Sequence, residues 1–325
     1  MDIPAIQPAK EQHSLLLLPN SALSRLEEIA CWFSARQGKE LPDTLNAAVV
    51  IFAADHGTNA KNIESDTDQR VRNAANSHSQ ISVLVKQSAA SLKIVDVGVA
   101  GDLSDVNTIK HAKIRSGSGN IAKGPAMTQS EYWEAVGIGE DMANQAIADG
   151  ANLLIAGEIS VGNHVSNTAV ICELMGLEPE EVLDSGLGAD HESYSHALLA
   201  IEEALARAQG TPSHDILMEL GGLETAAMAG FYRAAAQQGV PILLDGFTSA
   251  TAALTAAAWD VRIAGWMLAS YVSNCIGHRQ AMEELGVEPL VQLNANLNAA
   301  MGATMMIPVL QSALALHRGL IAAET

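Results

Sequence analysis

Short apolar runs alternate with longer amphipathic segments along most of this chain. Five runs of mainly apolar residues have the length of buried strands, and the segments between them repeat apolar residues with helical spacing. Strands that alternate with helices predict an α/β fold with an open parallel, Rossmann-like sheet flanked by helices. The predicted strands span residues 47–54, 92–99, 153–156, 216–220 and 240–244.

Helices are predicted where apolar residues share one face. The clearest start is Thr128, because its hydroxyl and Glu131 three residues later can form a capping box. Residues 263–271 fit either a strand or a buried helix, since periodicity does not separate the two in so short a run. The predicted helices span residues 21–37, 71–87, 128–149, 193–209, 223–238, 248–259, 277–285 and 301–320, with one more after the turn at residues 157–163.

The two ends of the chain have no strand partners in this pattern. We therefore expect a large α/β domain at residues 45–275 and a small helical domain made of residues 1–44 and 276–325. Residues 59–69 are polar and predict a surface loop or lid, and residues 179–190 predict a second loop.

Composition narrows the functional classes. The chain has 325 residues, 48% of them hydrophobic and 4% aromatic, and a net charge of -19 that argues against nucleic acid as a partner. Its three cysteines, Cys31, Cys172 and Cys275, fit no metal-site spacing and leave one unpaired in any disulfide scheme, so we expect a reducing cytoplasm. The longest apolar patch near the N-terminus, residues 15–18, is too short for a signal peptide or a membrane span. We expect neither a metal nor a cofactor.

Candidate chemistry gathers where predicted strands end. Glu158 lies in a glycine-bearing turn between a strand and a helix, an arrangement that points backbone N–H groups at an anion. Most such joints bind nothing, so a purely structural turn is the alternative. Asp55 and His56 follow the first strand, where open α/β sheets place ligands, although Asp55 could instead cap the next segment.

Positive charge is unevenly distributed along the sequence. All eight lysines lie at or before Lys123, so a phosphate bound by the second half must use backbone N–H groups, an arginine or a histidine. We expect four of the histidines to face solvent: His13, His111, His214 and His317.

Several short motifs occur together in one order and spacing. They are Phe52-Ala53-Ala54-Asp55-His56-Gly57, Gly157-Glu158 with Gly162-Asn163, Gly221-Gly222-Leu223-Glu224 with Ala226-Ala227-Met228-Ala229-Gly230, Leu244-Asp245-Gly246-Phe247, and Gly277-His278 followed by Leu285-Gly286-Val287-Glu288-Pro289-Leu290. Arg25-Leu26-Glu27 and Pro125-Ala126-Met127-Thr128 fit the same pattern. With these motifs the chain resembles the nicotinate-nucleotide–dimethylbenzimidazole phosphoribosyltransferase family over nearly its whole length.

The resemblance implies a homodimer whose active site lies at the C-terminal ends of the strands. It implies a phosphoribosyltransferase, a pentosyltransferase in which an azole nitrogen attacks C1′ of nicotinate mononucleotide and nicotinate leaves. A small-molecule nucleotide and an aromatic base would then be the partners. The residues that it implicates in substrate binding are Asp55, His56, His78, Gln80, Ser160, Gly162, Asn163, Gly186, His196, Gly221, Gly222, Glu224 and Asp245.

The chain departs from the family pattern where chemistry is carried. Ala299 stands where the family has its general-base glutamate, and Ala197 stands where the family has a phosphate-binding lysine. Three interpretations follow. Glu158 acts as a substitute base, the enzyme uses another acceptor or donor, or the protein is a catalytically impaired homologue that still binds a nucleotide or base.

Overall fold

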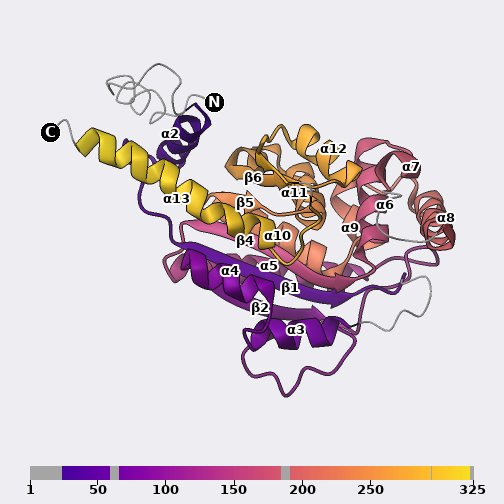
Figure 1. Ribbon diagram of the computed structural model, residues 1–325. Coiled ribbons are helices and arrows are strands. Elements are labelled where there is room, and N and C mark those ends of the chain that lie inside the picture. Colours follow the sequence, from indigo (N-terminus) through magenta and orange to yellow (C-terminus); the bar gives the residue numbers. More distant parts are fainter. Residues whose placement is uncertain (1–23, 59–65, 184–190, 294, 323–325) are drawn as a thin grey trace.

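One parallel sheet of seven strands organises the protein (Figure 1). The computed structural model describes residues 24–58, 66–183, 191–293 and 295–322. The strand order is β3-β2-β1-β4-β5-β6-β7, which confirms the predicted open parallel α/β sheet. The strands are β1 Ala47–Asp55, β2 Ser91–Gly98, β3 Lys110–His111, β4 Leu153–Val161, β5 Ile242–Leu244, β6 Met267–Val272 and β7 Pro289–Gln292.

Helices cover both faces of this sheet. The capping box at Thr128 and Glu131 is present at the start of α5, as predicted. Among the described residues, no helix is long and apolar enough to cross a membrane. The helices are α2 Arg25–Gln37, α3 Thr67–Ala75, α4 Gln80–Ser88, α5 Gln129–Ala148, α6 Asn163–Met175, α7 Pro179–Val182, α8 His191–Ala208, α9 Ile216–Leu220, α10 Leu223–Gln237, α11 Phe247–Trp259, α12 Ile276–Leu285 and α13 Met301–Ala322, with 3₁₀ turns η1 Ser213–Asp215 and η2 Val261–Trp266.

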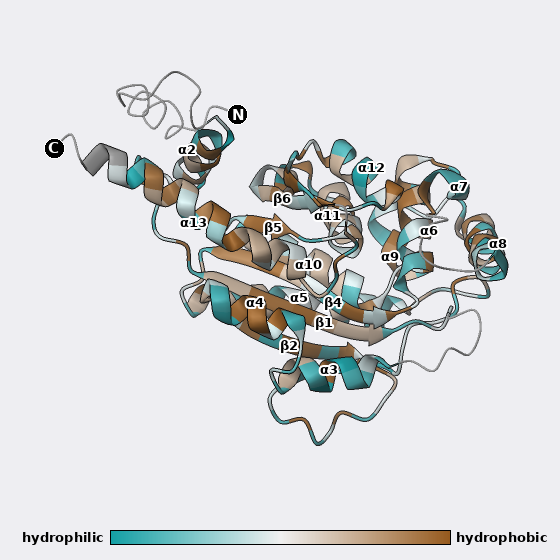
Figure 2. Ribbon diagram, in the orientation of Figure 1, coloured by the Kyte–Doolittle hydropathy of each residue, from teal (hydrophilic) through white to brown (hydrophobic). Residues whose placement is uncertain are grey.

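Strand β1 shows how the two layers of the core are divided. Val50 and Phe52 pack with α5, α6 and α10, whereas Val49 and Ile51 pack with α2, α3, α4 and α13. Successive side chains of a strand point to opposite faces, so an uninterrupted apolar strand such as this one must be covered on both. Figure 2 shows the same arrangement as hydrophobic strands between helices with hydrophilic outer surfaces.

The predicted strand at residues 216–220 is wrong, because this segment forms helix α9. Ile216, Leu217 and Leu220 are fully buried, and the Gly221 N–H donates to the carbonyl of Leu217 to close the last helical turn. Because this apolar run has only five residues and is buried on several sides, its periodicity does not distinguish a helix from a strand.

The single helix predicted at residues 71–87 is also wrong. The structure has two helices, α3 and α4, joined by a tight turn. Ser77 adopts a left-handed conformation with φ 61°, and Ser79 caps α4 by accepting a hydrogen bond from the Ser82 N–H. The polar residues of this segment therefore form a turn rather than one face of a long helix.

Other differences concern the ends of elements. Residues 263–271, for which the sequence allowed either a strand or a buried helix, belong to the 3₁₀ turn η2 and to strand β6. Strand β4 runs to Val161, so Glu158 lies within the strand and not in the turn after it. Strands β3 and β7 and the four-residue helix α7 were not predicted, and α7 lies in the predicted loop at residues 179–190.

His317 was expected to face solvent and is instead 1% exposed, because α13 packs against the rest of the fold. His111 and His214 are exposed as predicted, and His13 lies outside the described residues. The division into a large and a small domain stays a prediction. Helices α2 and α13 contact each other, and α13 also packs on α4, β4 and β6.

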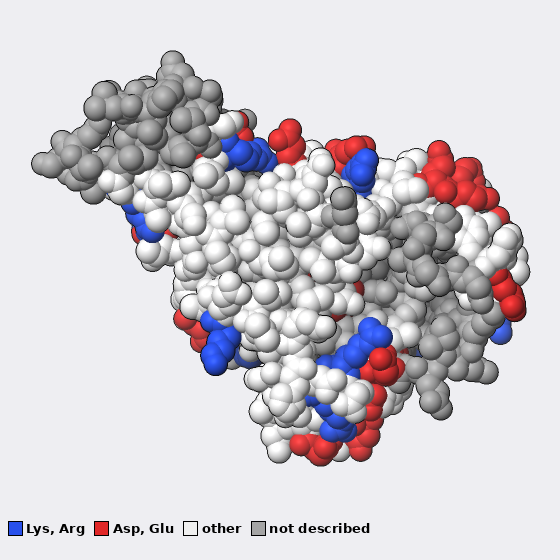
Figure 3. All heavy atoms as spheres, in the orientation of Figure 1, with Lys and Arg blue, Asp and Glu red and all other residues white. Residues whose placement is uncertain are grey.

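The surface in Figure 3 carries basic side chains at separated positions, while acidic side chains gather where Figure 1 places α7. Residues Glu178, Glu180 and Glu181 belong to that helix and its N-terminal cap. On the face shown no extended basic patch is available for a polyanion.

Candidate active site

Two cavities lie side by side at the C-terminal end of β4. The first, about 190 Å³, is bounded by the end of β4 and the starts of α6, α11 and α12. The second, about 240 Å³, lies between α3, α4 and the segment that leads into α13. Glu158, Ser160 and Asn298 line both cavities. These residues therefore form the wall that the two cavities share.

The first cavity is where three helices begin. Asn163 opens α6, Phe247 opens α11, and Cys275 is the residue before α12, and all three line the cavity. None of the three helices has a side-chain cap. Their first N–H groups and helix dipoles make this end of the cavity electropositive. None of its described lining residues is Lys or Arg.

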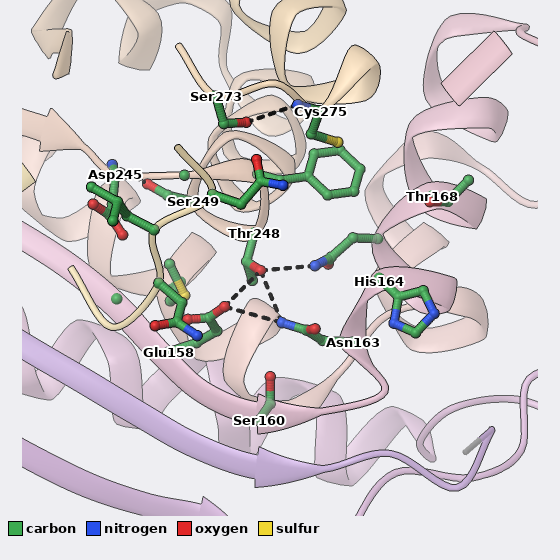
Figure 4. A pocket seen from close by; sticks show the side chains of 18 of the residues that line it. Glu158, Ser160, Asn163, His164, Thr168, Asp245, Thr248, Ser249, Ser273 and Cys275 are labelled. Carbon is green, nitrogen blue, oxygen red and sulfur yellow. Dashed lines mark hydrogen bonds between the residues drawn. The ribbon is translucent and has the colours of Figure 1, made fainter. Parts of the chain in front are cut away.

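Two neighbouring side chains hold the carboxylate of Glu158 (Figure 4). Asn163 Nδ2 and Thr248 Oγ1 each lie 3.1 Å from Glu158 Oε1 and donate to it. The second oxygen, Oε2, has only a long contact of 3.5 Å with the backbone N–H of Ala299. Oε1 is thus fixed on the first-cavity side, and Oε2 faces the residue that lines the second cavity.

The hydroxyl of Thr248 has only one direction in which to donate. Asn163 Nδ2 and Asn167 Nδ2 both donate to Thr248 Oγ1, at 3.1 and 2.9 Å. A hydroxyl has two acceptor positions and one proton. With both acceptor positions filled, the proton of Thr248 must point at Glu158.

A buried polar chain lies behind this arrangement. Thr225 Oγ1 lies 3.4 Å from Asn167 Oδ1 and 3.3 Å from Glu224 Oε1, and Glu224 Oε1 is 2.7 Å from His56 Nε2. The side chains of His56 and Glu224 are completely buried. Burial opposes protonation of His56, but the charge and hydrogen bond of Glu224 outweigh it and raise the pKa of His56. The contact with Glu224 therefore favours the protonated form of His56.

Two carboxyl groups at the site have raised pKa values. Burial raises the pKa of Glu158 to about 7, and the nearby charges of Asp245 and Glu224 add to the effect. Burial also raises the pKa of Asp245 to about 6, against the hydrogen bonds that this carboxylate accepts from Ala303, Ala300 and other backbone N–H groups. A carboxyl group with a pKa near 7 can both accept and release a proton at neutral pH.

The segment before α13 is tightly held next to Glu158. Asp245 Oδ1 accepts a hydrogen bond of 2.8 Å from the Ala303 N–H. Asp245 directly follows β5, so the end of this strand caps the N-terminus of α13. Ala299 and Ala300 both have left-handed backbones, with φ 54° and 62°. A Cβ on Gly157 would collide with the backbone of Ala300, so β4 and this segment meet at a position that only glycine allows.

The second cavity has apolar walls and a polar rim. Ala74, Ile81 and Ile159 are buried, whereas the side chains of Asn73 and His78 are exposed. Apolar walls with a few polar groups are typical of cavities that bind small organic ligands.

Comparisons with known proteins agree with this architecture. A family model described as phosphoribosyltransferase matches residues 1–325. A nicotinate-nucleotide–dimethylbenzimidazole phosphoribosyltransferase of Chromobacterium violaceum is 41% identical over 98% of this chain and 94% of its own length, and one of Xanthomonas axonopodis pv. citri is 37% identical over 94% and 89%. The crystal structure of CobT from Thermus thermophilus superimposes with a TM-score of 0.92, at 34% identity over 97% of this chain and 96% of that one.

The chain belongs to this phosphoribosyltransferase family. The resemblance stated from the sequence motifs is thereby confirmed. The enzyme class, a transferase of pentosyl groups, follows from the family.

The fold brings Glu158 and five of the residues predicted to bind substrate to the cavities of this phosphoribosyltransferase. Glu158 and Ser160 line both cavities, Asn163 and Asp245 line the first, and His78 and Gln80 line the second. Seven others lie outside the described lining of both: Asp55, His56, Gly162, His196, Gly221, Gly222 and Glu224. Gly186 lies outside the described residues.

Sequence reasoning missed two residues that orient the carboxylate, Thr248 and Asn167. Thr248 follows the motif Asp245-Gly246-Phe247 at the start of α11, so its position after a strand-end glycine was an available signal. Asn167 gave no signal, because a buried polar residue inside a helix is not visible from periodicity. Within the described residues, no group of His, Cys, Asp and Glu side chains could hold a metal ion.

Proposed function

We propose that this enzyme transfers ribose phosphate from nicotinate mononucleotide to a benzimidazole-like base, giving an α-ribotide and nicotinate, with Glu158 as the general base. The observation that carries the proposal is the position of Glu158 in the wall between two cavities. A transfer between two substrates needs one group that reaches the bond between them, and this carboxylate is so placed.

The first cavity would hold the nucleotide. Three uncapped helix starts meet there, and backbone N–H groups at helix N-termini bind phosphate without a side-chain cation. This would compensate for Ala197, which stands where the family has a lysine and is buried within α8 at 5% exposure. His196, its neighbour, does not line the described cavities.

The second cavity would hold the acceptor base, with Oε2 of Glu158 directed at it. In the reaction the acceptor's unprotonated nitrogen forms a bond to C1′, and the bond from C1′ to the nicotinate nitrogen breaks. The bonding electrons neutralise the pyridinium of nicotinate, and the proton on the acceptor's other nitrogen passes to Glu158. The raised pKa of Glu158, about 7, suits this transfer at neutral pH.

The remaining residues of the predicted site would then act in two ways. Ser160, Asn163, Asp245, His78 and Gln80 would contact or shape the substrates, because they line the cavities. The buried residues His56 and Glu224 would act through the chain of hydrogen bonds that ends at Thr248 and Glu158.

We also propose that the enzyme is a cytoplasmic homodimer in which the two chain ends form one small domain. Exposed apolar side chains on α4 and α13 support an interface on that side, namely Val83, Met305 and Leu316. Sedimentation of the purified enzyme would test the assembly, and replacement of Val83 and Leu316 by Glu should shift it toward monomer.

The direct test is turnover by purified enzyme of nicotinate mononucleotide with dimethylbenzimidazole, followed by chromatography of nicotinate and the α-ribotide. Formation of both products well above the control without enzyme is the expected result. Absence of turnover with dimethylbenzimidazole and with other azoles, while calorimetry still detects nucleotide binding, would favour an impaired homologue. The absence of turnover would then be explained by Ala299, which provides no carboxylate where the resemblance places the family's general base.

A further inference from the structure

Ser160 occupies a special place in the wall between the cavities. It lies two residues after Glu158 on β4, so the two side chains point to the same face of the sheet with Cα atoms about 7 Å apart. It lines both cavities, as Glu158 does. Figure 4 shows its hydroxyl pointing into the space beside Glu158 and Asn163.

The hydroxyl of Ser160 is buried and has no hydrogen-bond partner among the described residues. Its polar neighbours differ in this respect, because Asn163, Thr248 and Glu158 all bond to one another. A buried polar group left without a partner typically costs about 1–3 kcal/mol. Such a group at a cavity wall is explained if a ligand supplies the missing bond.

The chemistry of the transfer identifies which ligand atom is near. Glu158 must lie beside the proton-bearing nitrogen of the acceptor, and the other nitrogen of the same five-membered ring attacks C1′, so C1′ lies near the junction of the cavities and the phosphate lies deeper in the first. The hydroxyl group of the nucleotide closest to C1′ is the one on the adjacent ring carbon, the 2′-hydroxyl. It can both donate and accept, as Ser160 Oγ can.

We infer that Ser160 binds the 2′-hydroxyl of the ribosyl substrate and selects ribonucleotides over 2′-deoxyribonucleotides. This inference rests on the proposed function, because that reaction places C1′ near the junction of the two cavities. The contact holds the ribose while the acceptor approaches. Hydrogen bonds to the hydroxyl next to the reacting carbon strengthen in glycosyl-transfer transition states, so we expect the contact to affect kcat as well as KM.

The test is a four-way comparison of native enzyme and Ser160→Ala with nicotinate mononucleotide and its 2′-deoxy analogue. Replacing nicotinate mononucleotide by its 2′-deoxy analogue should lower kcat/KM about 10–100-fold more in the native enzyme than in Ser160→Ala. For Ser160→Ala the two nucleotides should differ only by their intrinsic reactivity. That intrinsic difference is common to both enzymes and cancels in the ratio of ratios. Ser88→Ala is the matched control, because Ser88 is buried on α4 away from both cavities and its hydroxyl bonds to the carbonyl of Leu84.

An unchanged preference in Ser160→Ala would overturn the inference, and a change confined to the KM of the acceptor base would overturn it in favour of a contact with the base. If the native enzyme forms no product with the natural nucleotide, the proposed reaction fails, and the same comparison is made with dissociation constants from calorimetry. A coupling of tenfold or more between Ser160 and the 2′-hydroxyl in binding would still support the contact. Additive binding effects would refute it.

Discussion

The two cavities that meet at Glu158 are built in different ways. The first consists of helix starts and buried side chains such as Thr248 and Asn167, whose positions are fixed by several hydrogen bonds. The second is formed by the exposed turn between α3 and α4, by buried apolar side chains such as Ile81, and by Ala299, which has a left-handed backbone. The cavity proposed for the nucleotide is thus specified by buried hydrogen bonds, whereas the cavity proposed for the acceptor combines buried apolar walls with an exposed polar rim.

This difference bears on the proposed role of Glu158 as the base. Ala299 lies on the acceptor side and has no carboxylate, while Glu158 belongs to the strand that borders both sides. A base held by the hydrogen bonds of the first cavity can accept a proton from an acceptor bound in the second cavity. Substitutions on the two sides should therefore have unequal effects.

The largest effect is expected for Glu158→Gln. This change keeps the size of the side chain and removes the proton acceptor, so kcat should fall about 10²–10⁴-fold. The measurement is steady-state release of nicotinate with saturating substrates. Full activity in this variant would exclude Glu158 as the base.

Unfolding cannot account for that loss if the variant is at least as stable as the native enzyme. The pKa of Glu158 is raised to about 7 in the fold, so the folded protein favours the protonated form. Ionisation then lowers stability as pH rises from the unfolded-state pKa near 4.5 to about 7. At pH 8 we expect Glu158→Gln to be about 2–3 kcal/mol more stable than the native enzyme, and the difference should vanish below about pH 4.5.

A second carboxylate introduced from the acceptor side should restore part of the activity. The Ala299 N–H lies 3.5 Å from Glu158 Oε2, and Ala299 lines the second cavity. Ala299→Glu in the Glu158→Gln background should raise kcat about tenfold or more above the single variant, because a general base contributes at least about 10²-fold when well placed. The matched control is Ala299→Gln in the same background, which has the same size and no base. Equal rates for the two double variants would show that residue 299 does not reach the proton-bearing nitrogen of the acceptor.

The pH dependence of kcat separates the role of the first cavity from that of the Glu158 carboxylate itself. Since the base must be ionised, kcat of the native enzyme should rise with pH through about 7 and level off above it. Thr248→Val removes a hydrogen bond that lowers the pKa of Glu158, so the rising limb should move to higher pH by about 0.5–1 unit. Activity at pH 7 should fall several-fold and recover in part at pH 9. Thr248→Ser is the control that keeps the hydroxyl, and a profile unchanged by valine would contradict the directed hydrogen bond.

The sequence alone predicted those parts of the site whose residues belong to motifs at the ends of strands. The parallel sheet, the placement of Glu158, Asn163 and Asp245 at its carboxyl edge, and the family all follow from short motifs in order. The cavity lined by both the α3–α4 turn and Ala299 did not follow, because it joins segments more than 200 residues apart. The polar run that forms this turn was predicted as helix, since the capping role of Ser79 becomes evident only when α4 is seen to start there.

The hydrogen bonds of Thr248 with Asn163 and Asn167 were equally beyond sequence reasoning. They depend on how α6 and α11 pack, and packing decides which of several polar side chains meet. The left-handed alanines are a third case. Alanine disfavours a positive φ by about 1–2 kcal/mol, so no propensity would place two such residues in a row.

The smallest effect is expected from relief of that strain at Ala299. Ala299→Gly removes a half-buried methyl group and allows φ 54° without steric cost, while glycine adds about 0.4–1 kcal/mol of entropy to the unfolded chain. Against a left-handed penalty of about 1–2 kcal/mol, the net result should be a gain of about 0.5–1 kcal/mol in the free energy of unfolding, measured by urea denaturation. Ala89→Gly is the matched control, because Ala89 is exposed with φ 53° at the end of α4 and does not line either cavity. If both variants gain stability equally and only Ala299→Gly raises KM for the acceptor base, the left-handed backbone at residue 299 serves the second cavity. If Ala299→Gly leaves that KM unchanged, the strain does not shape the acceptor site, and the contrast between the two cavities rests on their side chains alone.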